Sequence, residues 1–138
     1  MALEKYGLDV TYEQAGQAFA ESQYGLAHAN HHGRENCRHG IMPPLSGSPL
    51  YNRHADDIDF QIEADLFGII CPGMPAESNR LGHVFGHIMN YGDGVYGGLF
   101  VAGMYTAAYF ENDDVEKVVR AGLVLSLIHI SEPTRLRR

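Results

Sequence analysis

The chain has 138 residues, of which 45% are hydrophobic and 20% are charged, and this composition is typical of a folded globular domain. Its formal net charge is −7, which argues against a nucleic-acid partner or an anionic membrane surface, because either would need a basic patch. We therefore expect a small-molecule partner. The two cysteines, Cys37 and Cys71, are too few for a disulfide framework, and nothing at the N-terminus resembles a signal peptide. A reducing, cytoplasmic setting is the expectation.

The first part of the chain predicts helices followed by a proline-rich loop. Thr11 is placed to cap a helix that runs to about His32, because Gln14 occupies the capping-box position. A short helical piece is predicted over residues 33–39. Residues 41–54 contain Pro43-Pro44 and read as an ordered loop that crosses the domain and could line a cleft.

The rest of the natural portion also reads as helices joined by short loops. We predict helices over residues 55–71, 76–89 and 95–110, and an amphipathic helix from about residue 112 to 123. The apolar run over 95–110 is shorter than the roughly 20 residues that a bilayer span needs, so we predict a buried helix and no membrane association. The absence of strand-like alternation predicts an all-α helical bundle.

The last residues differ abruptly in character from the rest. Leu125 to Arg135 read LSLIHISEPTR, which is the translation of a transposon adapter end used in sequencing libraries. We therefore expect residues 125–138 to be an artefact, residues 1–124 to form the domain, and the natural protein to continue beyond Val124.

The segment 56–71 carries an unusual number of carboxylates, and a helical projection at 100° per residue divides it into strips. The two apolar strips are Ile58, Ile62, Leu66 and Ile69, and, nearly opposite, Phe60, Ala64, Phe67 and Cys71. The two polar strips are Asp56, Asp59 and Glu63, and Asp57, Gln61 and Asp65. Two opposed apolar strips predict a helix between two layers. The first polar strip is expected to face water. For the second, a solvated edge and a buried edge remain equally open, and buried carboxylates would favour Mg²⁺ or Ca²⁺ over zinc.

Two other segments are candidate sites. His28 and His32 lie one helical turn apart, a spacing that can hold zinc, but without an HExxH motif a structural or solvated histidine face is the stronger interpretation. No local pattern supports Cys37 as a nucleophile. Residues 90–98, NYGDGVYGG, place a glycine-containing turn before a helix N-terminus, which favours an anion or is simply a helix start capped by Asp93.

Three stretches, residues 26–47, 56–77 and 87–111, together resemble the ADP-ribosylglycohydrolase family, with the resemblance extending from about Leu3 to Leu123. The second stretch matches the pattern I-G-A-Q-I-R-A-D-x-F-G followed by P-G-x-P at Ile58, Gln61, Ile62, Ala64, Asp65, Phe67, Gly68, Pro72, Gly73 and Pro75. The third matches N-G-V-Y-G at Gly94, Val95, Tyr96 and Gly97. Two positions depart from the family: Glu63 stands where Arg is common, and Asn90 where His is common.

The resemblance implies an all-α, partial ADP-ribosylglycohydrolase-like domain that hydrolyses a glycosidic bond to ADP-ribose, usually with two Mg²⁺ ions. In the family, acidic motifs near both ends of the full-length protein hold these ions, and neither motif is found in its place here. The resemblance therefore implies the central fragment of an enzyme, inactive alone, that acts on a small-molecule or ADP-ribosylated substrate. The candidate substrate-binding residues are Gln61, Asp65, Asn90, Asp93 and Tyr96.

Two further hypotheses remain. A non-catalytic module of the same fold could recognise a nucleotide-sugar, and the departures at Glu63 and Asn90 favour it. Alternatively, the chain is a helical scaffold domain whose histidine-rich segment binds metal incidentally. Acidic motifs on both sides of the segment would favour the enzyme, and their absence would favour a binding module.

Overall fold

A computed structural model describes residues 2–130, of which residues 127–130 are described by their backbone alone. These residues are helical or irregular and contain no strand, so the all-α prediction is confirmed. In chain order the helices are α1 (Ala2–Tyr6), α2 (Tyr12–Ala20), α3 (His28–Arg38), the 3₁₀ turn η1 (Leu45–Gly47), α4 (Asp59–Glu63), α5 (Asp65–Ile70), α6 (Pro75–Met89), α7 (Asp93–Ala108) and α8 (Val115–Ile130).

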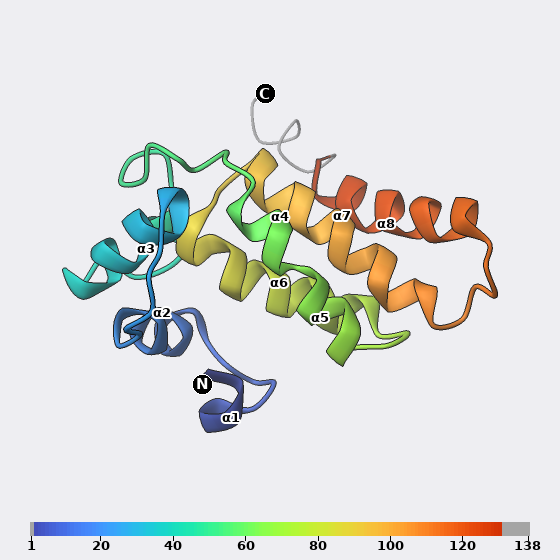
Figure 1. Cartoon of the computed structure of the whole chain (residues 1–138), viewed down its shortest axis with the longest axis horizontal. Coiled ribbons are helices and arrows are strands. Elements are labelled where there is room, and N and C mark those ends of the chain that lie inside the picture. Colours follow the sequence, from blue (N-terminus) through green and yellow to red (C-terminus); the bar gives the residue numbers. More distant parts are fainter. Residues whose placement is uncertain (1, 131–138) are drawn as a thin grey trace.

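Helix α7 is the centre of the bundle (Figure 1). Helices α4, α5, α6 and α8 all pack against it, whereas α2 and α3 pack together and against α6. The loop between α3 and α4 crosses the end of the molecule where α6 passes into α7. The three stretches that carry the family resemblance therefore meet at that end.

Phe60 is fully buried in the core, between α6 and α7. Its ring lies against Gly86 of α6 and Gly98 of α7, and a Cβ atom added at Gly86 would lie 2.8 Å from the ring. Phe67 continues the core, with its ring centroid 6.0 Å from that of Phe60 and 5.2 Å from that of Phe85. The Phe60 ring fits between the two helices because Gly86 and Gly98 have no side chains.

The predicted cap at Thr11 is confirmed. The Thr11 hydroxyl accepts a hydrogen bond from the backbone N–H of Gln14 at 3.3 Å, and the Gln14 side chain accepts one from the backbone N–H of Thr11 at 3.0 Å. The helix that begins there ends at Ala20, so the prediction that it reaches His32 is wrong.

Arginines explain why this helix is interrupted. Arg34 donates to the Tyr24 carbonyl oxygen at 2.5 Å, and Arg38 donates to the carbonyl oxygens of Ala20 and Ser22 at 2.9 and 3.0 Å. These carbonyl groups would otherwise accept hydrogen bonds within a continuous helix. The chain instead turns over residues 21–27, and α3 then runs through the piece that was predicted separately over 33–39.

The prediction of one helix over residues 55–71 is also wrong, because residues 53–58 form turns and a break at residue 64 separates α4 from α5. The strip that holds Phe60 is buried as expected. The opposite strip is exposed: 59% for Ile58, 68% for Ile62 and 43% for both Leu66 and Ile69. Helices α4 and α5 therefore lie on the surface of the bundle and not between two layers.

The first polar strip matches the expectation only in part, because Asp56 and Glu63 are exposed as predicted but Asp59 is not. Asp59, predicted to face water, is only 9% exposed, whereas Gln61, on the strip considered for burial, is exposed. The helical projection started at residue 56, but the helix starts at Asp59, so the assumed angles do not hold across the first residues.

The remaining helices follow the predictions more closely. Helix α6 begins with Pro75 in its first turn, as proline favours, and α7 begins at Asp93. Helix α8 starts at Val115 and continues to Ile130, past the predicted end near Leu123. The division into residues 1–124 and 125–138 stays a prediction, and residues 131–138 lie outside the described part. No helix in residues 2–130 is long and apolar enough to cross a membrane.

Candidate functional site

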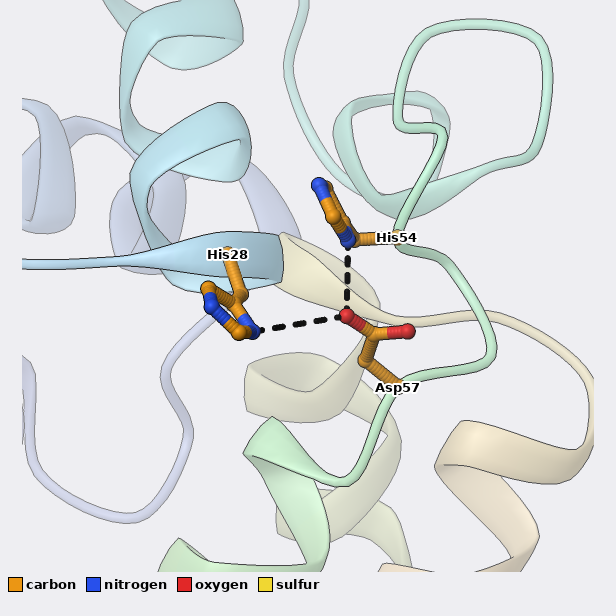
Figure 2. A group of neighbouring side chains, drawn as sticks. All are labelled: His28, His54 and Asp57. Atoms are coloured by element: carbon orange, nitrogen blue, oxygen red, sulfur yellow. Dashed lines mark hydrogen bonds and ion pairs between the residues drawn. The ribbon is translucent and has the colours of Figure 1, made fainter.

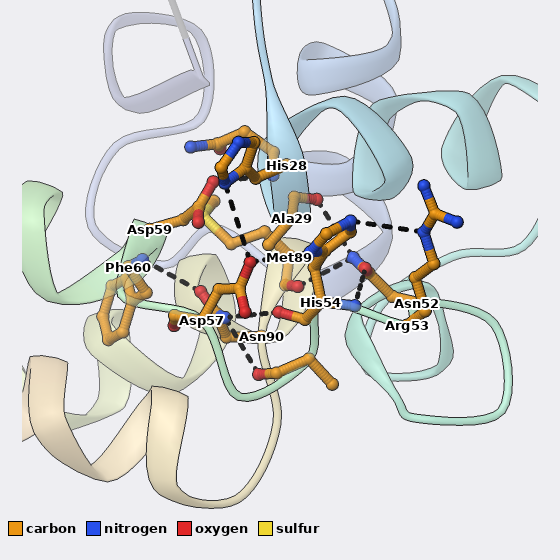
Figure 3. Close-up of polar contacts among 12 residues, drawn as sticks. His28, Ala29, Asn52, Arg53, His54, Asp57, Asp59, Phe60, Met89 and Asn90 are labelled. Atoms are coloured by element: carbon orange, nitrogen blue, oxygen red, sulfur yellow. Dashed lines mark hydrogen bonds and ion pairs between the residues drawn. The ribbon is translucent and has the colours of Figure 1, made fainter.

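The side chain of Asn90 organises the loop that precedes α4 (Figure 3). Asn90 ends α6 and is fully buried. Its side-chain N–H groups donate to the carbonyl oxygens of Ala55 and Asp57, both at 2.9 Å, and of His54 at 3.3 Å. Its side-chain oxygen accepts from the backbone N–H of Phe60 at 2.9 Å. One amide thus forms hydrogen bonds with four backbone groups of residues 54–60 and fixes this loop against the end of α6.

A second buried asparagine, Asn52, connects the same loop to α3 and α6. Its Nδ2 atom donates to the carbonyl oxygens of Ala29 at 3.0 Å and Met89 at 2.8 Å. Its Oδ1 atom accepts from the backbone N–H of His54 at 3.0 Å. Because Asn52 and Asn90 are both fully buried, the backbone of residues 52–57 is held in one conformation.

Above these two asparagines lies a cluster of His28, His54 and Asp57, here called the histidine–aspartate cluster (Figure 2). Asp57 Oδ2 lies 2.7 Å from His54 Nδ1 and 3.8 Å from His28 Nδ1. The three atoms are all within 4.8 Å of one another. The His28 side chain is 71% exposed, while those of His54 and Asp57 are 27% and 38% exposed. The cluster is therefore open to solvent on the His28 side.

The hydrogen bonds of His54 define where its proton lies. Asp57 accepts at Nδ1, so Nδ1–H is the donor, and Arg53 Nε donates to His54 Nε2 at 3.3 Å. The ring of His32 lies 5.2 Å from that of His54, tilted by 31°. Partial burial, followed by the charge of Arg53, lowers the pKa of His32. The neutral form of His32 is thus favoured.

Two further carboxylates lie beside the cluster and are bound by Asn30. Asp59 Oδ1 accepts from the backbone N–H of Asn30 at 3.1 Å, and Glu63 Oε1 accepts from its side chain at 2.7 Å. Glu63 is exposed along its length, but its carboxyl group faces the protein, and desolvation raises its pKa, partly offset by the bond from Asn30. Asn30 holds both carboxylates in place.

The structure scatters the five predicted substrate-binding residues. Asn90 is fully buried, and its side-chain amide forms hydrogen bonds with the backbone. It therefore holds the loop in place and does not line a cleft. Gln61 is exposed on α4 beside Gly97 of α7, where an added Cβ would lie 2.9 Å from its Oε1. Asp93 is exposed at the start of α7, four residues before Gly97 and therefore on the same side of that helix.

The other two predicted residues lie elsewhere. Asp65 begins α5, and its Oδ1 accepts from the backbone N–H of Leu66 at 2.8 Å. Tyr96 is partly buried and packs against the core. Within residues 2–130, no hydrogen bond or ion pair joins any two of the five. Only Gln61 and Asp93 are placed to share one exposed surface.

The sequence pattern did not predict the partners of His28. Its spacing paired His28 with His32, but the structure brings His28 to His54 and Asp57. The spacing of His54 and Asp57, three residues apart in a proline-rich loop, was a signal that could have been considered. Cys37, by contrast, is 2% exposed and burial raises the pKa of its thiol, which makes it a poor nucleophile, as expected.

Two pockets lie away from this cluster. One, of about 450 Å³, is lined by residues 9–12 and by Arg80, His83 and Val84 of α6. The other, of about 420 Å³, lies between α7 and α8 and includes Phe110 and Arg120. Neither contains a residue of the histidine–aspartate cluster or of the predicted substrate-binding set.

Comparisons with protein-family models, with curated proteins and with solved structures found no match. The two Mg²⁺ ions that the family resemblance implies can be tested against the donor atoms present. Mg²⁺ is bound by oxygen atoms, whereas the histidine–aspartate cluster offers two imidazole nitrogens and one carboxylate. The carboxylates of Asp59 and Glu63 are already bound by Asn30. The described residues therefore do not fit a Mg²⁺ centre.

Proposed function

We propose that this chain is the central segment of an ADP-ribosylglycohydrolase-like domain and supplies one face of the site that binds an ADP-ribosyl or related nucleotide-sugar group. The observation that carries the proposal is the convergence of the three resembling stretches on one end of the bundle. Asn90, from the third stretch, bonds the backbone of Asp57 and Phe60 in the second, and Asn30, from the first, binds Asp59 and Glu63.

The exposed groups at this end suit a polar, hydroxyl-rich ligand. Gln61 offers an amide and Asp93 a carboxylate, and both groups form hydrogen bonds with ribose hydroxyls. The exposed guanidinium of Arg53 and the imidazole of His28 offer donors for phosphate oxygens nearby. Two buried asparagines fix the backbone beneath these groups, so binding would require little ordering of the loop.

The chain by itself is proposed to bind without turnover. The described residues do not fit the Mg²⁺ ions of the family, so no catalytic step is assigned to them. An assay of ADP-ribose release from ADP-ribosyl-arginine in the presence of Mg²⁺ should show no activity with this chain. Robust turnover would contradict the proposal that it is inactive alone.

Isothermal titration calorimetry with ADP-ribose tests the binding function. We expect saturable binding to the 138-residue chain, and at least a tenfold rise in Kd for the double variant Gln61→Ala, Asp93→Ala. Asn112→Ala is the matched control, because Asn112 is exposed beyond the opposite end of α7. Absence of binding at millimolar ADP-ribose, or equal weakening by the control, would contradict the assignment.

A non-catalytic nucleotide-sugar-binding module is the second candidate. Two observations favour it: the position that is commonly His in the family is a buried scaffold residue, Asn90, and the carboxylates beside the cluster are bound to Asn30 and not arranged around a Mg²⁺ site. Genomic sequence on both sides of this segment separates the two candidates. Acidic motifs on both sides would favour the hydrolase, and their absence would favour the binding module.

A further inference from the structure

We propose that His28, His54 and Asp57 form a binding site for a divalent transition-metal ion such as Zn²⁺, independently of the function proposed above. Figure 2 shows both imidazoles turned toward the same carboxylate. Two histidines and one carboxylate are a ligand set found in three-ligand zinc sites, in which a water or another group takes the fourth position. The imidazole nitrogens favour zinc, nickel or copper over Mg²⁺ and Ca²⁺.

The distances are close to those of a metal centre. With metal–ligand bonds of about 2.1 Å, the ligand atoms of a tetrahedral site lie about 3.4 Å apart. The observed separations from Asp57 Oδ2 are 2.7 Å to His54 Nδ1 and 3.8 Å to His28 Nδ1. The first separation must widen and the second must shorten, each by less than an ångström, while the ligand nitrogens of His28 and His54, which lie within 4.8 Å of each other, must also come to about 3.4 Å. His28 is at the start of α3 and exposed, so its side chain is free to make this adjustment.

Hydrogen bonds from two buried asparagines hold the backbone of His54 and Asp57, two of the three ligand residues. Asn52 accepts from the backbone N–H of His54 at 3.0 Å, and Asn90 donates to the carbonyl oxygen of Asp57 at 2.9 Å (Figure 3). The ring of His32 also packs against that of His54. A site whose ligands are already oriented loses little conformational entropy when the ion binds.

The side chain of Arg53 disfavours metal binding at His54. Without metal, His54 carries its proton on Nδ1 and accepts from Arg53 at Nε2. Coordination through Nδ1 displaces that proton, and a neutral ring then carries its proton on Nε2, where it faces the Arg53 donor. The exposed Arg53 side chain must therefore turn away, and its positive charge also disfavours the cation. Removing this side chain should tighten metal binding.

Titration of the metal-free 138-residue chain with ZnCl₂, followed by calorimetry, and with Co²⁺, followed by its visible d–d absorption, tests the proposal. We expect one ion at this site, and at least a tenfold rise in Kd for each of His28→Asn, His54→Asn and Asp57→Asn. His39→Asn is the matched control, because His39 is an exposed imidazole just past α3 and outside the cluster. Its affinity should not change.

Two further measurements separate a loss of metal binding from a loss of folding. His28→Asn alters an exposed side chain, so its circular dichroism spectrum should match that of the parent even if His54→Asn perturbs the loop. Arg53→Ala should lower the Kd at least threefold. Absence of Zn²⁺ and Co²⁺ binding, an unchanged Kd in His28→Asn, or an unchanged or higher Kd in Arg53→Ala would overturn the proposal.

Discussion

Replacing Asn90 by alanine removes the group that holds residues 54–60 against α6. The substitution deletes two donated hydrogen bonds of 2.9 Å, to Ala55 and Asp57, and one accepted bond of 2.9 Å, from Phe60. At a net value of about 1 kcal/mol for each such bond, the free energy of unfolding should fall by about 3 kcal/mol. The freed Phe60 N–H is buried, which adds a desolvation cost, whereas the Ala55 carbonyl oxygen keeps a second partner, the backbone N–H of Tyr91 at 2.9 Å.

Urea denaturation followed by circular dichroism at 222 nm measures this loss. For a domain of this size we also expect the Tm to fall by roughly 10 °C. Asn90→Asp keeps the shape and the accepting oxygen but cannot donate, so it should destabilise at least as much as alanine. Asn112→Ala is the control, because Asn112 is exposed. A loss below about 0.5 kcal/mol in both Asn90 variants would refute the scaffold role.

Three other substitutions probe separate parts of the fold. Thr11→Ala removes the cap of α2 and should lower the free energy of unfolding by about 1 kcal/mol in urea denaturation; an unchanged midpoint would contradict the capping box. Gly86→Ala places a Cβ 2.8 Å from the Phe60 ring and should cost about 1–3 kcal/mol by the same measurement, whereas a stabilised variant would show that the slot can widen. Burial lowers the pKa of His87, so the folded state resists protonation and should lose stability as the pH falls through about 6.5. His87→Phe should reduce that loss, measured as Tm between pH 7.5 and 5, and an identical pH profile would contradict the assignment.

Local signals predicted the parts of the fold that depend on local chemistry. The Thr11 cap, the helix predicted over 76–89 and the helical character of 95–108 depend on neighbouring residues, and all three are found. The burial of the strip that includes Phe60 also followed from its apolar periodicity.

Contacts distant in sequence decided the rest. Helix α2 ends at Ala20 because arginines of α3, ten to eighteen residues away, bind the carbonyl groups of the turn. Residues 55–58 precede α4 and are not helical, and Asn90 bonds the carbonyl oxygens of Ala55 and Asp57 and the backbone N–H of Phe60 there. A projection over a single helix cannot include a partner 30 residues away, and for this reason it placed Asp59, which is buried, on the strip expected to face water.

The candidate site shows the same division. The sequence identified His28 as a possible ligand and Cys37 as an unlikely nucleophile from local patterns. It did not pair His28 with Asp57, because that contact joins α3 to a loop almost thirty residues further along. Asn90 was predicted to contact the substrate, but in the structure it is buried and forms hydrogen bonds with the backbone.

We propose that the three resembling stretches form one ligand-binding face at the end of the bundle where α6 passes into α7. Amide chemical-shift mapping of the ¹⁵N-labelled chain during titration with ADP-ribose tests this most directly. We expect saturable shifts at Gln61 and Asp93 and in the 53–57 loop, with Asn112 unchanged. Shifts confined to the pocket between α7 and α8, or no shifts at millimolar ADP-ribose, would contradict it.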